Sequence, residues 1–369
     1  MNSRSDSSNA ASRPAFTRRR IVTVTAVSLL MAGLPAPLDR VGSDAAVSVV
    51  EMPVPRIGPG EALVKTRACG ICGSDLLAWY VRAKAGTILG HELSGEIVEV
   101  GAGVEGFTEG DRVVPHHHAP CGACDECRSG RPVHCREWRR SSLDPGGMAE
   151  FVRIPAANLA RDTQKTPPSL TDEEATFVEP LATVVKAFGR GRYAPSRSLL
   201  AVGLGTTGQL AIRLAKFLGA TRIAGADRVA SRLDVAKTSG ATEVLDVSRA
   251  PISGSGAFDF VFVGPGKSSV IEPALEAVAP GGTLLAFTMA APDERLAVSP
   301  HDLYFREVEI VPSYSAGPEE MREALALLSS RRIRVTDLVT QRFGIDRARE
   351  AFARAADPEG SVKVLLTFG

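Results

Sequence analysis

A glycine-rich turn between an apolar strand and an apolar helix constrains the fold of this chain more than any other feature. Residues 199–202 predict a buried strand, which leads into Gly203-Leu-Gly205-Thr-Thr-Gly208 and then a helix with regularly spaced apolar residues. One glycine permits the tight turn, one lets the backbone approach a pyrophosphate, and one lets the helix pack closely on the strand. The helix N-terminus then offers N–H groups and the positive end of its dipole to phosphates. The turn therefore predicts a dinucleotide-binding site.

An acidic residue at the end of the next strand indicates which dinucleotide binds. Residues 222–226 predict that strand, and Asp227 follows it, 19 residues after Gly208. A carboxylate there can accept hydrogen bonds from ribose hydroxyls and repels a 2′-phosphate, so NAD is expected rather than NADP. Asp227 could equally be a helix cap or a surface acid, and Arg228 and Arg232 leave NADP open. The predicted cofactor contacts are Gly203, Gly205, Thr206, Thr207, Gly208, Asp227, Arg228 and Arg232.

The glycine turn lies in one of two regions that differ in periodicity. Residues 181–315 alternate apolar strands with helical stretches, which is typical of a parallel α/β unit. Residues 46–155 consist of short β-branched runs separated by turn residues, which predicts a β-rich, barrel-like lobe. The last part of the chain adds two helices and a closing strand. The sequence thus predicts an α/β unit combined with a β-rich lobe.

Four cysteines fall close together between these regions. Cys121, Cys124, Cys127 and Cys135 are spaced so that four thiolates can surround one tetrahedral ion. Because four thiolates leave no open position, they predict a structural zinc, and they favour a reducing compartment. His134 is expected to be only a neighbour of this site. The run of His116, His117 and His118 looks like a metal tract, but loop positioning or hydrogen bonding beside the zinc lobe, 116–140, is the favoured role.

The N-terminus and the charge balance limit the remaining functions. The chain has 43 Lys and Arg against 42 Asp and Glu, so no field for a nucleic acid is expected. Residues 1–30 predict a disordered tail, although the arginines at 18–20 precede an apolar stretch and mimic an export signal. A strand at 22–30 behind this tail or a start at Met31 is favoured over export, because thiolate metal sites and a dinucleotide fingerprint belong in the cytoplasm. No segment is apolar for long enough to predict a membrane span.

Further motifs make the chain similar to a known family. Five motifs follow one another along the chain: Cys69-Gly-Ile-Cys72-Gly-Ser74-Asp75, Gly90-His91-Glu92, the cysteine lobe, Glu179-Pro-Leu and the glycine turn. From about residue 45 onward this order resembles the zinc-dependent medium-chain dehydrogenases, most closely the sorbitol, threonine and butanediol branch. The resemblance implies a GroES-like catalytic domain, 31–180 plus 316–369, with an inserted Rossmann domain, 181–315, whose doubly wound sheet binds NAD.

The resemblance also implies the catalytic residues. Cys72 and His91 would bind a catalytic zinc, with Glu92 or Glu179 completing the set, and the two glutamates cannot be separated from sequence. Such an open zinc site polarises an alcohol oxygen. Ser74 would pass the hydroxyl proton outward, and Asp75 would support a zinc ligand. Taken singly, each of these residues could also be an ordinary buried side chain, helix cap or turn residue.

Some positions depart from the family pattern. The family often has a histidine five residues after the zinc cysteine, where this chain has Leu77, so the proton needs another exit. Trp79 and Tyr80 could wall the substrate pocket, although packing is the favoured role of Trp79. Cys69 matches no zinc ligand and is expected to be buried.

The implied activity is oxidation of a secondary alcohol on a polyol, sugar or cyclitol to a ketone, with hydride passing to NAD. The alternatives are an amino-alcohol or threonine-type dehydrogenase and a non-catalytic, zinc-stabilised NAD sensor. The resemblance also implies a homodimer or homotetramer, formed through an edge strand such as residues 308–315.

Overall fold

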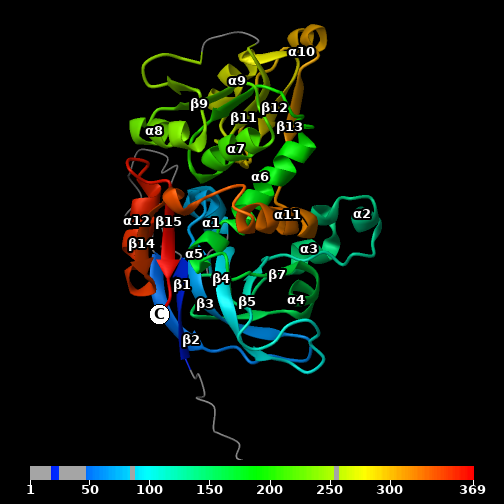
Figure 1. Ribbon diagram of the computed structural model, residues 1–369, viewed down its shortest axis with the longest axis vertical. Coiled ribbons are helices and arrows are strands. Elements are labelled where there is room, and N and C mark those ends of the chain that lie inside the picture. The colour runs from blue at the N-terminus through cyan, green and yellow to red at the C-terminus, as the bar shows by residue number, and fades with distance from the viewer. Residues whose placement is uncertain (1–17, 25–46, 84–87, 253–256) are drawn as a thin grey trace, which may run out of the picture.

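The computed structural model describes residues 18–24, 47–83, 88–252 and 257–369, and Figure 1 shows them as two lobes joined by helices. The lower lobe is built on a seven-stranded sheet and the upper lobe on a six-stranded sheet. These two sheets confirm the predicted combination of a β-rich lobe with an α/β unit. The bounds of the two predicted domains stay a prediction.

The seven-stranded sheet combines strands from both ends of the chain. Its central strand β3 pairs with β4 on one side and with the C-terminal strand β15 on the other, both antiparallel. Leu366 of β15 lies opposite Cys69 of β3, so the last residues of the chain complete this sheet. The order is β14 (Val339–Gly344), β15 (Lys363–Thr367), β3 (Ala62–Gly70), β4 (Glu92–Val100), β5 (Arg112–Pro115) and β7 (Thr163–Lys165), with β6 (Phe151–Ile154) on β3.

The six-stranded sheet is parallel throughout and has apolar clusters on both faces. Its order is β10 (Glu243–Asp246), β9 (Ile223–Asp227), β8 (Leu199–Val202), β11 (Phe258–Val263), β12 (Val278–Ala286) and β13 (Glu309–Pro312). The helices after its strands are α7 (Thr206–Phe217), α8 (Ala230–Ser239), α9 (Ser268–Glu276) and α10 (Pro300–Arg306). This is a doubly wound sheet, and ligands bind such sheets at the carboxyl ends of the strands.

Two helices lie between the lobes in Figure 1. They are α6 (Val178–Arg190) and α11 (Pro318–Ser329), which pack on each other. The sequence analysis predicted α11 but not α6, whose apolar face contributes Leu181 and Val184 to the core shared with the parallel sheet. The first turn of α6 carries Glu179 and thereby brings this side chain to the junction of the lobes.

The N-terminal prediction needs a correction. Arg18–Val24 forms strand β1, antiparallel to β2 (Val47–Pro53), where a disordered tail or a strand at 22–30 was expected. The carboxylate of Glu150 accepts hydrogen bonds from the backbone N–H of Arg20 at 2.6 Å and from its Nε at 2.8 Å. This distant partner explains why the strand begins within the arginine run. The rest of the predicted tail, with Met31, lies outside the described residues.

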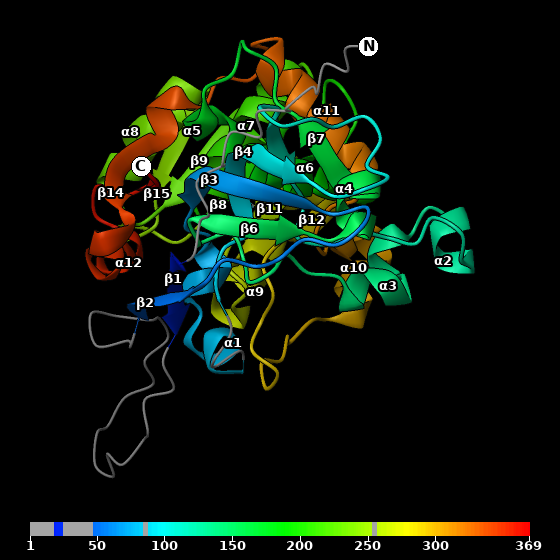
Figure 2. The same ribbon diagram turned by 90° about the horizontal axis from the view of Figure 1, so that it is seen from below.

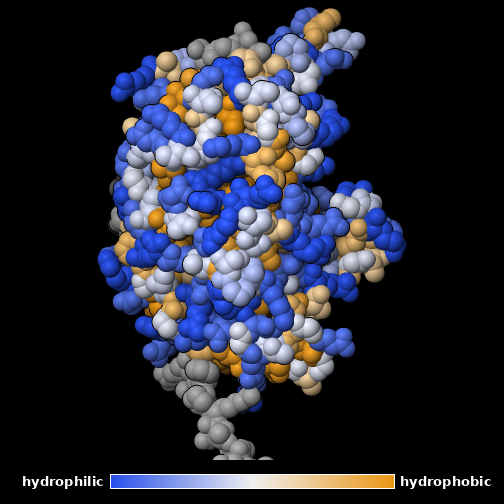
Figure 3. Space-filling view, viewed as in Figure 1, coloured by the Kyte–Doolittle hydropathy of each residue, from blue (hydrophilic) through white to orange (hydrophobic). Residues whose placement is uncertain are grey.

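Short helices complete the β-rich lobe and the C-terminal part. They are α1 (Ala78–Ala83), α2 (Asp125–Arg128), α3 (Arg136–Arg140), α4 (Ala156–Asp162), α5 (Asp172–Ala175) and α12 (Ala348–Ala356). Figures 1 and 2 show α2 projecting from the body of the molecule. The face in Figure 3 is mainly hydrophilic, with scattered hydrophobic patches. None of the helices within the described ranges combines the length and apolarity needed to cross a bilayer.

Candidate active site and metal centres

A loop and the start of a strand bring three candidate zinc ligands together. Cys72 follows β3 and precedes the 3₁₀ helix Gly73–Leu76, while His91 and Glu92 lie where β4 begins. One ligand atom from each of Cys72, His91 and Glu92 lies within 4.8 Å of the other two. A thiolate, an imidazole and a carboxylate form a donor set that zinc accepts, so these three residues fit a zinc ion.

Asp75 lies directly behind two of these residues. Its Oδ2 accepts a hydrogen bond from the backbone N–H of Cys72 at 3.1 Å, and its Oδ1 lies 3.9 Å from Nδ1 of His91. Asp75 is buried, and this burial raises the pKa of its carboxyl group. Asp75 therefore lies where it can support both candidate ligands, and this supporting role stays a prediction. Ser74 and Leu77 are half-buried beside it, and Trp79 packs edge-on against Tyr80 with ring centroids 5.7 Å apart.

Glu92 has a buried cationic partner that the sequence analysis missed. The ammonium group of Lys363, the first residue of β15, donates a hydrogen bond to Glu92 Oε2 and another, at 3.2 Å, to the carbonyl of Ile71. The Lys363 and Glu92 side chains are only 1% and 2% exposed. A Cβ at Gly70 would lie 2.0 Å from Glu92 Oε2, so only glycine leaves room for this pair. The one feature of the sequence that could have indicated this pair is Lys363 itself, a charged residue in an otherwise apolar strand.

Burial lowers the pKa of the Lys363 ammonium, but the Glu92 carboxylate and the Cys72 and Cys69 thiols together outweigh burial and raise this pKa above its ordinary value. Lys363 therefore remains an ammonium ion, and its hydrogen bond holds Glu92 beside Cys72.

Glu179 belongs to a different cluster. One of its carboxylate oxygens lies within 4.8 Å of ring nitrogens of His116 and His117, and burial raises the pKa of its carboxyl group. The His117 ring also lies near the first cluster, with its centroid 5.1 Å from that of His91. The structure thus groups Glu92 with Cys72 and His91, and Glu179 with two histidines of the His116–His118 run.

The four cysteines of the projecting lobe converge as their spacing predicts. Cys121, Cys124, Cys127 and Cys135 each offer a sulfur within 4.8 Å of the others, and all four are free thiols. The backbone N–H groups of Ala123 and Cys124 point at the Cys121 sulfur from 3.4 and 3.3 Å. These N–H groups lower the pKa of the Cys121 thiol to about 6. The pKa of the Cys127 thiol is raised to about 12 by burial and by its cysteine neighbours, so the convergence of the four sulfurs, and not their ionisation, is what fits a closed tetrahedral zinc site. His134 is exposed and lies outside the cluster.

The glycine turn has the geometry that the fingerprint predicts. Gly203 has a φ of +86°, and a Cβ at Gly208 would lie 2.1 Å from the Gly203 carbonyl oxygen. Among the described residues, none has an atom within 4 Å of a Cβ built at Gly205, where α7 begins, so this side of the helix N-terminus has room for a phosphate. The Thr206 hydroxyl, in contrast, donates to the Val362 carbonyl at 2.8 Å, whereas Thr207 is half-buried in the first turn of α7.

Asp227 and the two arginines are placed differently. Asp227 ends β9, and its carboxylate accepts hydrogen bonds from the backbone N–H of Leu204 at 2.6 Å and of Val229 at 3.0 Å. Arg228 is exposed. Arg232 donates to the Ser361 carbonyl from Nε at 3.1 Å and from an Nη at 2.9 Å. Its guanidinium therefore binds the chain before β15, and a contact of Arg232 with the cofactor stays a prediction.

Residues 361–363 connect the glycine turn to the Cys72 cluster. Thr206 contacts Val362, and the next residue, Lys363, holds Glu92. One short segment before and within β15 thus contacts both candidate sites, although its sequence carries no motif.

Comparison with known proteins agrees with this geometry. Residues 58–164 match the alcohol dehydrogenase GroES-like domain, and residues 206–330 match the zinc-binding dehydrogenase model. D-arabinitol dehydrogenase 1 of Uromyces fabae is 32% identical, over 84% of this chain and 90% of its own length. L-threonine 3-dehydrogenase of Bacillus licheniformis is 30% identical, over 82% and 90%.

A solved structure has the same fold. A zinc-binding dehydrogenase of Sinorhizobium meliloti bound to NADP has a TM-score of 0.80 at 26% identity, covering 95% of this chain and 99% of that one. Both domain models, the relatives and the two candidate sites agree, and the chain belongs to the zinc-dependent medium-chain dehydrogenase family.

Proposed function

We propose that this protein oxidises a secondary alcohol of a polyol to a ketone and transfers the hydride to NAD, with a catalytic zinc held by Cys72, His91 and Glu92. One observation carries the proposal: residues 361–363 contact both the metal-ligand cluster and the dinucleotide turn, so the two sites are neighbours. A dehydrogenase needs its alcohol-activating group and its hydride acceptor in one site. A protein that only sensed NAD would have no use for an open Cys-His-Glu set.

The residues around the cluster have separate roles in this proposal. Zinc, when bound, supplies Lewis-acid polarisation of the alcohol oxygen. Asp75 holds the Cys72 backbone and faces His91, so it positions both ligands. Ser74, half-buried next to Cys72, is the expected first acceptor of the hydroxyl proton. Because Leu77 cannot carry that proton further, it leaves through water or another group.

The four-cysteine lobe is proposed to hold a second, structural zinc. Its thiols are arranged around one point, and Trp138 packs fully buried beneath them. The chain would therefore bind about two zinc ions, one catalytic and one structural. The six free cysteines agree with the proposed location in the cytoplasm, where thiols stay reduced.

The relatives guide the choice of substrate. D-arabinitol dehydrogenase 1 and the D-altritol 5-dehydrogenase of Agrobacterium fabrum, which is also 32% identical, are named for polyols. The L-threonine 3-dehydrogenases keep an amino alcohol as the second candidate. Rates of NADH formation with D-arabinitol, D-altritol, sorbitol and L-threonine test the proposal. A kcat/KM highest for a polyol supports it, whereas a value highest for threonine favours the second candidate.

The Asp227 carboxylate is expected to determine the preference for NAD. Asp227→Asn removes the negative charge at the end of β9 and weakens acceptance from ribose hydroxyls. Since hydrogen bonds to charged groups contribute about 1.5–3 kcal/mol, we expect NAD affinity to fall about 10- to 100-fold. The affinity for NADP should fall less, because the Asp227→Asn variant no longer repels the 2′-phosphate of NADP.

Fluorescence titration of each variant with NADH and NADPH measures this effect. Asp246→Asn is the matched control, since Asp246 ends the neighbouring strand β10 and pairs with Ser248. An unchanged ratio of the two affinities in Asp227→Asn would show that another group selects the cofactor.

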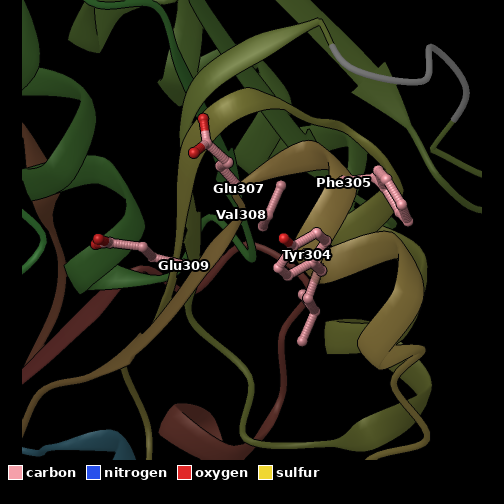
Figure 4. Close-up of a pocket in the computed structure, with 6 residues that line it drawn as sticks. Tyr304, Phe305, Glu307, Val308 and Glu309 are labelled. Atoms are coloured by element: carbon pink, nitrogen blue, oxygen red, sulfur yellow. The ribbon is translucent and has the colours of Figure 1, made fainter.

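We further propose a homodimer formed through the edge of the parallel sheet. β13 is one of the two edge strands of this sheet, and Tyr304 and Phe305 on α10, which precedes β13, are 77% and 72% exposed. Figure 4 shows the shallow hollow that these rings and Val308 line. An open strand edge next to exposed aromatic rings is typical of an association surface.

Phe305→Asp is therefore expected to convert the dimer to a monomer, because a carboxylate would be buried at the contact. Light scattering after size exclusion gives the mass directly. Phe217→Asp is the control, since Phe217 is a 42% exposed ring at the end of α7, away from this edge. A wild-type protein that is monomeric at micromolar concentration would contradict the proposed dimer.

A further inference from the structure

The three histidines that follow β5 contact different parts of the molecule. His116 and His118 both pack on Trp138 of the four-cysteine lobe, with ring centroids 4.9 and 5.2 Å from that of the indole. The His117 ring lies beside the candidate zinc ligands, with its centroid 5.1 Å from that of His91 and the two ring planes tilted by 47°. The middle histidine of the run therefore faces the proposed catalytic site, although the proposed hydride transfer gives it no role.

The two outer histidines hold the loop on either side of His117. Nδ1 of His116 lies 2.7 Å from Oδ2 of Asp162, and both of these side chains are fully inaccessible to solvent. Nδ1 of His118 lies 2.7 Å from the Ser141 carbonyl oxygen, to which it donates a hydrogen bond. Because the loop is anchored at both neighbours, the His117 ring has a fixed position beside His91.

The Cys72 cluster has a buried side and a more accessible side. Glu92 is 2% exposed and accepts a hydrogen bond from Lys363, which closes the buried side. Cys72, His91 and His117 are each only half-buried. An alcohol therefore reaches the candidate ligands from the side on which the His117 ring lies. The atoms next to its reacting carbon then lie close to this ring.

We propose that His117 recognises the hydroxyl group on the carbon next to the reacting carbon, and that it thereby makes the enzyme prefer polyols to monohydric alcohols. This inference rests on the proposed alcohol oxidation. A neutral imidazole donates a hydrogen bond from one ring nitrogen and accepts one at the other, so it can pair with a hydroxyl in either direction. A site that pairs with a substrate hydroxyl discriminates against an analogue without it, because the polar group of the site is then left unpaired.

The test compares two alcohols that differ in this one hydroxyl. NADH formation gives the ratio of kcat/KM for meso-2,3-butanediol to kcat/KM for 2-butanol, in the wild type and in His117→Phe. This substitution keeps a ring and removes its hydrogen-bonding atoms, so the ratio should fall about 5- to 10-fold, the factor that one hydrogen bond supplies. The kcat/KM for D-arabinitol should fall by a similar factor, and it decides the question if the wild type oxidises neither butanol. An unchanged preference in His117→Phe overturns the proposal.

Two further variants separate hydrogen bonding from packing. His118→Asn is the control within the same run, because its amide can still donate to the Ser141 carbonyl, and its ratio should equal that of the wild type. His117→Gln keeps a donor and an acceptor and should retain most of the preference, which a role of the ring in packing alone would not predict. If His117→Phe does not fold, His117→Leu takes its place in the comparison with His117→Gln.

Zinc content and wild-type activity separate this inference from the proposed function. Each His117 variant should keep about two zinc ions per chain, and a loss of zinc would make His117 a metal ligand and overturn the assignment. A wild-type protein that forms no NADH with the butanols or with D-arabinitol would contradict the proposed function itself. Wild-type turnover with an unaltered preference in His117→Phe would contradict the role of His117 alone.

Discussion

Replacing Cys72 with alanine is expected to abolish alcohol oxidation while NAD binding persists. The thiolate is the only soft donor in the Cys72, His91 and Glu92 cluster, and zinc binds thiolates tightly. Without the ion, stabilisation of several kcal/mol is lost from the transition state, so kcat/KM should fall by about 10³ or more. NADH formation with the best polyol measures the loss. NADH titration should give an unchanged affinity, because the glycine turn is intact.

Cys69→Ala is the matched control for this prediction. Cys69 is also a buried thiol, three residues earlier on β3, but it belongs to no metal cluster among the described residues. The control should keep its activity within a few-fold and its zinc content. Cys72→Ala with full turnover would place the alcohol-activating group elsewhere.

Lys363→Met should produce the largest loss of stability. It removes the only cation bonded to the buried Glu92 carboxylate, whose side chain is 2% exposed, among the contacts described. Breaking a buried ion pair on one side typically costs about 3–5 kcal/mol, because the remaining charge is left without compensation. Urea unfolding of the zinc-free protein, in which no metal ion compensates Glu92, measures this cost. Activity should fall as well, because Glu92 loses the partner that fixes it beside Cys72.

Two comparisons separate charge from packing in this prediction. Lys165→Met is the same substitution in a half-exposed ion pair, in which Lys165 Nζ lies 2.8 Å from a carboxylate oxygen of Asp111. It should lower the free energy of unfolding by less than about 1 kcal/mol. Adding Glu92→Gln to Lys363→Met removes the uncompensated charge and should restore part of the stability. A loss below about 1 kcal/mol for Lys363→Met alone would mean that the pair contributes little.

The N-terminal strand and Arg232 show where local patterns are insufficient. The apolar composition of 22–30 suggested a strand there, but pairing with β2 and the Glu150 contact determine that it is Arg18–Val24. Arg232 lies near Asp227 in sequence, yet its guanidinium reaches the Ser361 carbonyl, 129 residues away. A long side chain such as that of arginine can reach many possible partners, and only the folded structure determines which of them lies close enough to bind.

The sequence by itself determined the family, the two-part fold and the positions of Cys72, His91 and the four-cysteine lobe, because each follows from residue types at short, fixed spacings. Only the tertiary structure shows that Glu92 lies with Cys72 and His91, while Glu179 lies with His116 and His117 and also near His91; which glutamate binds the ion stays a prediction. Glu92 and Lys363 are 271 residues apart and meet only because β15 and β4 both flank β3, whereas Glu179 is carried on α6 to the histidine run. A buried charge is stable only beside a compensating partner, and the order of the strands determines which residue is close enough to be that partner. Local sequence motifs do not specify strand order.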